Sequence, residues 1–335
     1  MLMAVPRVLF IVGPTASGKT AASLQLALNA RVEIVNADSR QVYRGMSVGT
    51  GKPTPADLAS VPHHLIDVAP PDERYNLARF LAEARAAIAD VAARGAVPVV
   101  VGGTGQYVWG LVEGWHAPAV PPNPALRAEL AEEAQRTGPE ALHERLRAVD
   151  PGSAATIDLR NVRRVVRALE VWHETGAPFS RQRRRSPPGF EPVLFGIAPE
   201  RADLRRRAGE RVDAMLRGGW PEEVRRLLRD GYSPELPSFS SVGYREVAAY
   251  VRREMTFEET AERVKSATYR LIRRQATWFK PGDARIVWSP DAASLVERAL
   301  TAISAPVPVN PAPVPVIPAP VPVIPAEAGI SHPRA

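Results

Sequence analysis

The N-terminal third of the chain alternates short, mostly apolar runs with longer stretches of mixed character. Residues 7–12, 32–35 and 97–101 are rich in Val, Ile and Leu. Such runs are typical of strands that are buried on both faces. Residues 76–94 carry apolar side chains at helical spacing. The alternation predicts an α/β fold, with a buried parallel sheet covered by helices on both faces.

Beyond residue 121 the pattern becomes helical. Asn123 and Gly138, each followed by proline, begin two helices, and Asp158 is expected to cap a third that ends near Gly176. The next apolar run, residues 192–197, returns to the sheet. The pattern predicts an all-helical insertion within the core, followed by C-terminal helices. The predicted segments are the first part of the core at 1–120, the insertion at 121–188, the second part of the core at 189–300 and a tail at 301–335.

The tail is rich in proline and valine. The heptapeptide APVPVIP occurs at residues 312–318 and again at 319–325. Frequent proline prevents a backbone ladder, so we expect a disordered, polyproline II-like segment without a catalytic role. A docking segment for a partner's groove is the alternative.

Composition narrows the choice of partners and compartment. The chain has no cysteine, which excludes disulfides, thiolate metal sites and thiol catalysis. No apolar run approaches the roughly 18 to 20 residues of a spanning helix, and no cleavage signal follows the N-terminus, so a cytoplasmic protein is expected. The net charge is +7. From Ala305 onward the only charges are Glu327 and Arg334, so the excess belongs to the body of the protein and favours an anionic partner.

A phosphate-binding loop follows the first predicted strand. Its sequence GPTASGKT fits the P-loop pattern between a strand and a helix, where backbone N–H groups cradle phosphates. Lys19 adds a positive charge, and the Thr20 hydroxyl is the predicted protein ligand of a Mg²⁺ ion. The predicted phosphate-binding residues are Gly13, Pro14, Thr15, Ala16, Ser17, Gly18, Lys19 and Thr20.

A P-loop alone leaves kinase, hydrolase and transferase open. The strand at 97–101 ends without Asp or Glu, which weakens the hydrolase interpretation. Asp38 follows the second strand, which we expect beside the P-loop strand, and it faces the crevice where such sheets bind ligands. A base or metal partner is one role for Asp38, and a helix cap is the other.

Seven motifs in order carry a specific resemblance. They are GPTASGKT at 13–20, NADSRQVYRGMSVGTGKP at 36–53, PHHLIDV at 62–68, VGGTGQYVWGL at 101–111, RVVRALEV at 164–171, SVGYRE at 241–246 and RRQATWFK at 273–280. Together they resemble the tRNA dimethylallyltransferases, or tRNA isopentenylpyrophosphate transferases. The resemblance covers residues 6–288 and leaves out the tail.

The resemblance implies a P-loop core with a helical insertion and a monomeric enzyme. It implies transfer of a dimethylallyl group from dimethylallyl diphosphate to N6 of the adenosine 3′ of the anticodon, in tRNAs that read codons beginning with U. Residues 15–20 would contact the donor, and Asp38 would receive the N6 proton. The residues implied along the tRNA path are Asp38, Ser39, Arg40, Gln41, Thr104, Arg127, Arg163, Arg164, Val165, Val166, Arg167, Ser240, Ser241, Val242, Gly243, Tyr244, Arg245, Arg273, Arg274, Gln275, Thr277, Trp278 and Lys280.

Allyl transfer requires stabilised negative charge and an assisted nucleophile. Charge builds on the leaving diphosphate, so fixed cations and N–H donors should face it. Arg211 is our candidate for a further cation, with a solvated helix charge as the alternative. An exocyclic amine is a weak nucleophile that a carboxylate assists, and the target base must leave its stack. The candidate catalytic residues are Asp38, Thr104, Lys19 and Arg211.

The insertion is dense in arginine, which suits phosphate contacts, although a solvated face is the plainer interpretation. The densest stretch, residues 158–185, holds Arg160, Arg163, Arg164, Arg167, Arg181, Arg183, Arg184 and Arg185. Four residues depart from the family pattern: Gln41, the pair Ser240-Ser241, and Arg205, which stands where an aromatic residue is expected after Leu204. His63 and His64 lack companions at metal-ligand spacing and are expected to be structural.

Three alternatives to tRNA prenylation stay open from the sequence. A nucleoside or nucleotide kinase would use ATP at the same loop. A non-enzymatic RNA-binding module would keep the loop without using it. Prenylation of free AMP is a close relative of tRNA prenylation, and a comparison of AMP with an anticodon stem-loop would distinguish the two.

Overall fold

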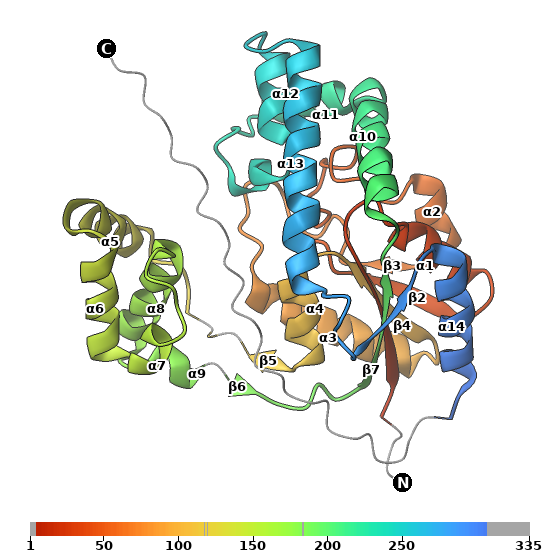
Figure 1. Ribbon diagram of the computed structural model, residues 1–335, viewed down its shortest axis with the longest axis horizontal. Helices are drawn as coiled ribbons and strands as arrows, with labels where there is room; N and C mark the ends of the chain where they lie inside the picture. The colour runs from red at the N-terminus through yellow and green to blue at the C-terminus, as the bar shows by residue number, and fades with distance from the viewer. Residues whose placement is uncertain (1–4, 117, 119, 183, 307–335) are drawn as a thin grey trace. The chain divides into compact units, whose positions relative to one another are not determined.

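The computed structural model describes residues 5–306, except residues 117, 119 and 183 (Figure 1). The described chain forms two compact units. One runs up to Val112 and resumes at Pro187, and the other is Glu113–Ser186. The Pro-rich segment predicted to be a disordered tail lies beyond the described residues, except for its first six positions, of which residues 301–304 end a helix.

The first unit is built on a six-stranded sheet in which every neighbouring pair is parallel. Its strands, in the order β3-β2-β4-β1-β7-β8, are β3 (His63–His64), β2 (Val32–Asn36), β4 (Val97–Gly102), β1 (Arg7–Val12), β7 (Glu191–Ile197) and β8 (Ile286–Ser289). The predicted parallel sheet is confirmed. The sequence did not indicate β3 and β8, because they are too short to show an apolar pattern.

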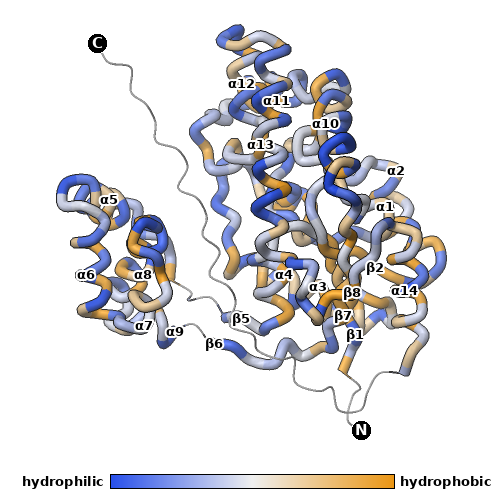
Figure 2. Tube along the Cα trace, in the orientation of Figure 1, coloured by the Kyte–Doolittle hydropathy of each residue, from blue (hydrophilic) through white to orange (hydrophobic). Residues whose placement is uncertain are grey.

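Alternating side chains of the strands face opposite layers of helices. Leu9 and Ile11 pack with the helices α1 and α14, so Val8 and Phe10 point to the other face, over which α3 and α4 lie. Figure 2 shows apolar residues along the strands and polar residues along α10. The helices are α1 (Lys19–Ala27), α14 (Ala292–Ser304), α3 (Leu77–Ala93), α4 (Gly105–Val112) and α10 (Arg201–Arg217).

A second apolar core lies beyond the sheet, between helices and the loop that follows β2. Trp220 and Tyr244 meet edge to face at 5.5 Å between ring centroids, and Phe239 packs on Tyr244. Val42 and Met46 join the same cluster, which anchors the loop after β2 to these helices. The further elements are α2 (Pro55–Ser60), α11 (Trp220–Arg229), the 3₁₀ turn η1 (Pro237–Ser240), α12 (Tyr244–Val251) and α13 (Phe257–Trp278).

The second unit is mainly helical, with a short antiparallel ribbon. Its elements are β5 (Trp115–His116), α5 (Pro124–Thr137), α6 (Pro139–Val149), α7 (Pro151–Ala154), α8 (Val162–Thr175), α9 (Phe179–Gln182) and β6 (Arg184–Arg185). Its limits, Glu113 and Ser186, differ from the expected 121 and 188 because β5 and β6 pair with each other at the two crossings.

Three of the helix ends in this unit follow the sequence signals, and one does not. α6 begins at Pro139, directly after Gly138, as expected. The Asn123 side chain accepts the N–H of Leu126, and Gly176 ends α8 in the left-handed conformation with φ of 65°. The prediction that Asp158 caps α8 is wrong. Asn161 is the cap, and Asp158 binds the backbone N–H and guanidinium of Arg160 instead.

Candidate active site

The candidate site lies where β1, β4 and β2 end. The P-loop follows β1, Thr104 follows β4 and Asp38 follows β2. The expectation that β1 and β2 are neighbours is wrong, because β4 lies between them. This order places Thr104 between the other two loops and lets its hydroxyl oxygen accept the N–H of Ser39 at 3.0 Å.

The P-loop has the backbone of a phosphate cradle. Gly13 and Gly18 take φ of 144° and 103°, and Ala16 is left-handed with φ of 63°. A Cβ on Gly13 would lie 2.7 Å from the carbonyl oxygen of Ile197, so only glycine fits. The Ser17 hydroxyl is buried and has no hydrogen-bond partner among the described residues, as expected of a donor aimed at a ligand.

Lys19, Asp38 and Arg211 form one electrostatic group. Burial lowers the pKa of Lys19 to about 8, a shift that Asp38 opposes and Arg211 reinforces. Burial also lowers the pKa of Arg211, and Asp38 opposes that shift too. The ammonium of Lys19 donates to the carbonyl of Pro14 at 2.7 Å. One carboxylate and two cations from β2, α1 and α10 therefore share the site.

Arg211 is held against the loop after β2. Its Nη2 donates to the carbonyl of Gly51 at 3.2 Å, and a Cβ on Gly51 would lie 1.8 Å from the same nitrogen. Gln41 donates to that carbonyl as well, at 3.0 Å. The alternative of a fully solvated helix charge for Arg211 does not match this packing. The departure at Gln41 from the family pattern has the structural role of fixing the Gly51 turn.

The loop around Asp38 holds its carboxylate through one of the two oxygens. Oδ1 accepts the N–H of Arg40 at 2.8 Å, and the Asn36 side chain binds the backbone of Asp38 on both sides. No hydrogen bond to Oδ2 is found within the described part of the chain. The loop thus orients the carboxylate through Oδ1, and Oδ2 is the oxygen that could receive a proton from a substrate.

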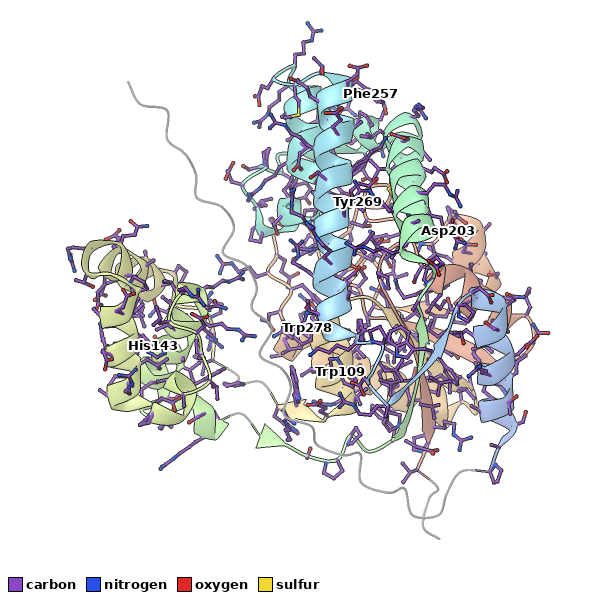
Figure 3. All side chains as sticks on the ribbon, in the orientation of Figure 1. Trp109, His143, Asp203, Phe257, Tyr269 and Trp278 are labelled. Atoms are coloured by element: carbon purple, nitrogen blue, oxygen red, sulfur yellow. The ribbon has the colours of Figure 1, made fainter. Side chains whose placement is uncertain are left out.

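The C-terminal end of α13 contacts the loops around the site. Gln275 accepts the N–H of Thr15 at 2.7 Å and donates to the carbonyl of Gly103 at 3.2 Å. The ring of Trp278 covers Gly105, where a Cβ would lie 2.2 Å from it. Figure 3 shows Trp109 beside this end of α13, and its indole N–H donates to the Trp278 carbonyl at 3.0 Å. Gln275 therefore supports the P-loop and the β4 loop, and Trp278 supports the start of α4.

The other predicted tRNA-path residues of this unit divide by exposure. Ser240, at the end of η1, and Arg245, in the first turn of α12, are exposed. Val242 is half-buried, and Ser241 and Tyr244 are buried. Gly243 is also buried, and a Cβ there would lie 2.2 Å from Trp220. Exposed side chains line the last turns of α13 and the residue two beyond it: Arg273, Arg274, Thr277 and Lys280.

In the helical unit, two of the predicted arginines bind a buried acid. Glu170 is 0% exposed and accepts hydrogen bonds from Arg127 at 2.7 and 2.8 Å and from Arg167 at 2.5 Å. Val165 and Val166 pack in the core of the unit. Arg163 is exposed. From the sequence we assigned all of these side chains to the tRNA path. In the structure the two valines pack in the core, Arg127 and Arg167 form ion pairs, and Arg163 is exposed.

Replacing Glu170 by alanine is expected to destabilise the helical unit by about 3 kcal/mol, the lower end for a broken buried pair, because both arginines stay partly hydrated. Burial raises the pKa of Glu170, but the arginine hydrogen bonds outweigh this and lower it overall. The pair therefore stabilises at neutral pH and loses its effect in acid. Hydrogen exchange of the α5 and α8 amides in the full chain measures this. Glu174→Ala, an exposed neighbour on α8, should cost under about 1 kcal/mol, and equal losses in the two variants contradict the prediction.

A residue that sequence reasoning missed is Glu223 on α11. It is buried and accepts three backbone N–H groups of the loop after β2. The sequence offers only the pair Glu222-Glu223 on an amphipathic helix, which is typical of a solvated face. Only tertiary packing shows which of the two acids turns inward.

The donor set suits a Mg²⁺ ion that arrives with a diphosphate. Among the described residues, no group of three or more His, Cys, Asp or Glu is arranged to hold a metal. Mg²⁺ characteristically takes one or two protein oxygens and completes its shell with phosphates and water. Thr20, in the first turn of α1, offers such an oxygen.

Among the residues that the structure describes, no helix is both long and apolar enough to cross a membrane.

Comparisons with known sequences give one consistent result. The family model described as IPP transferase matches residues 41–282, and the one described as Isopentenyl transferase matches residues 6–69. The chain is 47% identical to the tRNA dimethylallyltransferase of Roseiflexus sp. (strain RS-1), over 88% of this chain and 96% of the relative. It is 50% identical to that of Roseiflexus castenholzii, over 87% of this chain and 95% of the relative.

Solved structures agree. The full-length tRNA isopentenylpyrophosphate transferase from Bacillus halodurans is 35% identical, with a TM-score of 0.64 over 89% of this chain and 95% of that one. A eukaryotic dimethylallyltransferase captured acting on tRNA is 26% identical, with a TM-score of 0.73 over 89% of this chain and 78% of that one. The relatives found by sequence and by structure are thus the same kind of enzyme.

Proposed function

The chain belongs to the IPP transferase family, the tRNA dimethylallyltransferases, and from this premise we propose how its residues carry out the reaction. The enzyme transfers a dimethylallyl group from dimethylallyl diphosphate to N6 of the adenosine that follows the anticodon, in tRNAs reading codons that begin with U. The observation that carries the residue assignments is the convergence of Asp38, which follows β2, Lys19, at the start of α1, and Arg211, from α10.

The P-loop face binds the donor. Residues 15–20 are the proposed ligands of the diphosphate, through the Ser17 hydroxyl and the backbone N–H groups that have no partner within the loop. The N–H groups of Thr15 and Ser17 already donate to Gln275 and Pro14. Lys19 and Arg211 balance the charge that grows on the leaving oxygens as the carbon–oxygen bond breaks. A Mg²⁺ ion on Thr20 would add a further positive charge next to these oxygens.

Asp38 acts on the acceptor. As N6 bonds to the allylic carbon, the bond from that carbon to the diphosphate oxygen breaks, and the oxygen keeps the electron pair. The N6 proton passes to Oδ2 of Asp38. Thr104, which holds the N–H of Ser39, keeps the Asp38 loop in place beside the β4 loop. Asp38 and Lys19 thus serve the two ends of one displacement.

The tRNA contacts are proposed at exposed cationic side chains. The basic body of the protein supplies phosphate contacts that offset the cost of unstacking the target base. Arg40 and Gln41 are proposed near the base because they flank Asp38. The exposed candidates in the two units are Arg163, Ser240, Arg245, Arg273, Arg274, Thr277 and Lys280. Val165 and Val166 lie in the core of the helical unit and Tyr244 in the core of the first unit, so each is proposed to act by packing and not by side-chain contact with tRNA.

We further propose that the enzyme works as a monomer in the cytoplasm. The residues assigned to the reaction, Asp38, Lys19 and Arg211, all lie within the first unit. Sedimentation at working concentration tests this, and an activity that falls on dilution with dissociation of a dimer contradicts it.

The direct test uses Mg²⁺, radiolabelled dimethylallyl diphosphate and tRNA lacking the modification. Label is expected in tRNA, in the anticodon loop, and not in AMP offered alone. Phosphate transfer from ATP to a small acceptor, or tRNA binding without any product, contradicts the proposal.

The lowered pKa of Lys19 makes donor binding depend on pH. Below about 8 the free ammonium is charged, and above it the ligand must recruit a proton to Lys19. Affinity for a non-reactive thiodiphosphate analogue is therefore expected to fall above pH 8, by at most about tenfold per pH unit. Calorimetry between pH 7.5 and 9.5 measures this. Lys19→Arg stays charged throughout, and an equal fall in that variant contradicts the assignment.

A further inference from the structure

Glu223 is a buried carboxylate outside the residues assigned to the reaction. It is 2% exposed. Its Oε2 accepts the backbone N–H groups of Ser47 at 2.6 Å and Val48 at 2.7 Å. Its Oε1 accepts the N–H of Gly49 at 3.3 Å and the hydroxyl of Tyr244 at 2.7 Å. Four donors on one carboxylate offset the large cost of burying its charge.

The groups around Glu223 fix the turn that it binds. Burial, together with the adjacent carboxylate, raises the pKa of Tyr244 well above its ordinary value, so the hydroxyl stays a donor. A Cβ on Gly49 would lie 2.1 Å from the Trp220 indole nitrogen, so the backbone passes directly over that ring. Within the turn, the N–H of Gly51 donates to the carbonyl of Val48 at 3.0 Å.

The far end of the same turn faces the reaction site. The carbonyl of Gly51 accepts Arg211 at 3.2 Å and Gln41 at 3.0 Å. Arg211 in turn interacts with Asp38 and Lys19. A continuous set of hydrogen bonds therefore connects a carboxylate on α11 to the cation proposed to stabilise the leaving group.

We propose that Glu223 is a positioning residue for dimethylallyl transfer: it holds the N–H groups of residues 47–49 so that the Gly51 carbonyl fixes Arg211 beside Asp38. The inference rests on the proposed function, because Arg211 matters only if it serves that reaction. A turn that shifts by about 1 Å misplaces the guanidinium, and errors of that size cost up to about 10²-fold in rate.

The test is a double-mutant cycle in the full chain, with labelled dimethylallyl diphosphate and tRNA. Glu223→Gln is expected to lower kcat by about tenfold and to leave KM for tRNA within about twofold, because only positioning is disturbed. In an Arg211→Ala background the same change should lower kcat by less than about twofold, since its target is gone. A purely structural role predicts that the two effects multiply.

Glu222→Gln is the matched control. Glu222 is the preceding residue of α11, exposed and paired with Arg225. The replacement of Glu222 is expected to change neither kcat nor KM for tRNA. Tyr244→Phe is the second variant. It removes one donor to Glu223 and keeps the ring packing, so it should lower kcat by a smaller factor, again only when Arg211 is present.

The outcomes separate the two proposals. A parent enzyme that forms no prenylated tRNA contradicts the proposed function itself. An active parent in which Glu223→Gln and Tyr244→Phe leave kcat unchanged, or in which their effects multiply with that of Arg211→Ala, overturns the positioning role alone. Should Glu223→Gln fail to fold, Tyr244→Phe decides between the same two results.

Discussion

Asp38→Ala is expected to lower the rate of dimethylallyl transfer by about 10²–10⁴-fold, the usual contribution of a positioned general base. Asp38 is the only carboxylate of the described chain found in the electrostatic group with Lys19 and Arg211. Without it, the N6 proton has no acceptor as the new bond forms. Because Asp38 is one of many predicted tRNA contacts, tRNA affinity should change little.

Asp38→Asn is the matched variant. The amide oxygen still accepts the N–H of Arg40, which Oδ1 of Asp38 binds at 2.8 Å, so the loop keeps its shape while the basic oxygen is lost. The rate of single-turnover transfer with saturating tRNA, and tRNA binding measured separately, distinguish an effect on the chemical step from an effect on tRNA affinity. Activity within tenfold of the parent in both variants removes Asp38 from the role of base.

The sheet was predictable because buried parallel strands leave a continuous apolar signal. Residues 7–12 form β1 as predicted, and the P-loop pattern identified the turn and helix that come after this strand. The order of the strands was not predictable from the same signal. We expected β2 to lie beside β1, whereas β4 lies between them, and this order depends on pairing between strands that are far apart in the sequence.

Charged residues show the limit of sequence reasoning most clearly. Arg127 and Arg163 look equivalent in the sequence, yet one neutralises buried Glu170 and the other is exposed. Arg205, which replaces an expected aromatic residue, lies over the ring of Tyr269 at 4.3 Å, so the facing helix α13 supplies the aromatic partner. The role of such a charged residue depends on which helix packs against its own helix, and a single sequence does not show this packing.

Lys19→Ala is expected to lower kcat/KM for dimethylallyl diphosphate by about 10²–10³-fold, the loss typical of removing one fixed donor from a developing oxyanion. The backbone cradle and Ser17 remain, so binding of the donor should weaken less than the rate falls. The reason is that charge on the diphosphate grows between the ground state and the transition state, and only the difference accelerates the reaction.

Lys280→Ala provides the opposite pattern for comparison. Lys280 is exposed just beyond α13, on the proposed tRNA surface. Its loss should raise KM for tRNA and weaken the salt dependence of tRNA binding, because one phosphate contact disappears, without changing the donor constants. Steady-state kinetics with each substrate varied in turn measure both. If Lys19→Ala instead raises only KM for tRNA, the P-loop is not the donor site. The loss of a contact to the leaving diphosphate must lower the rate of the step in which the bond to that diphosphate breaks.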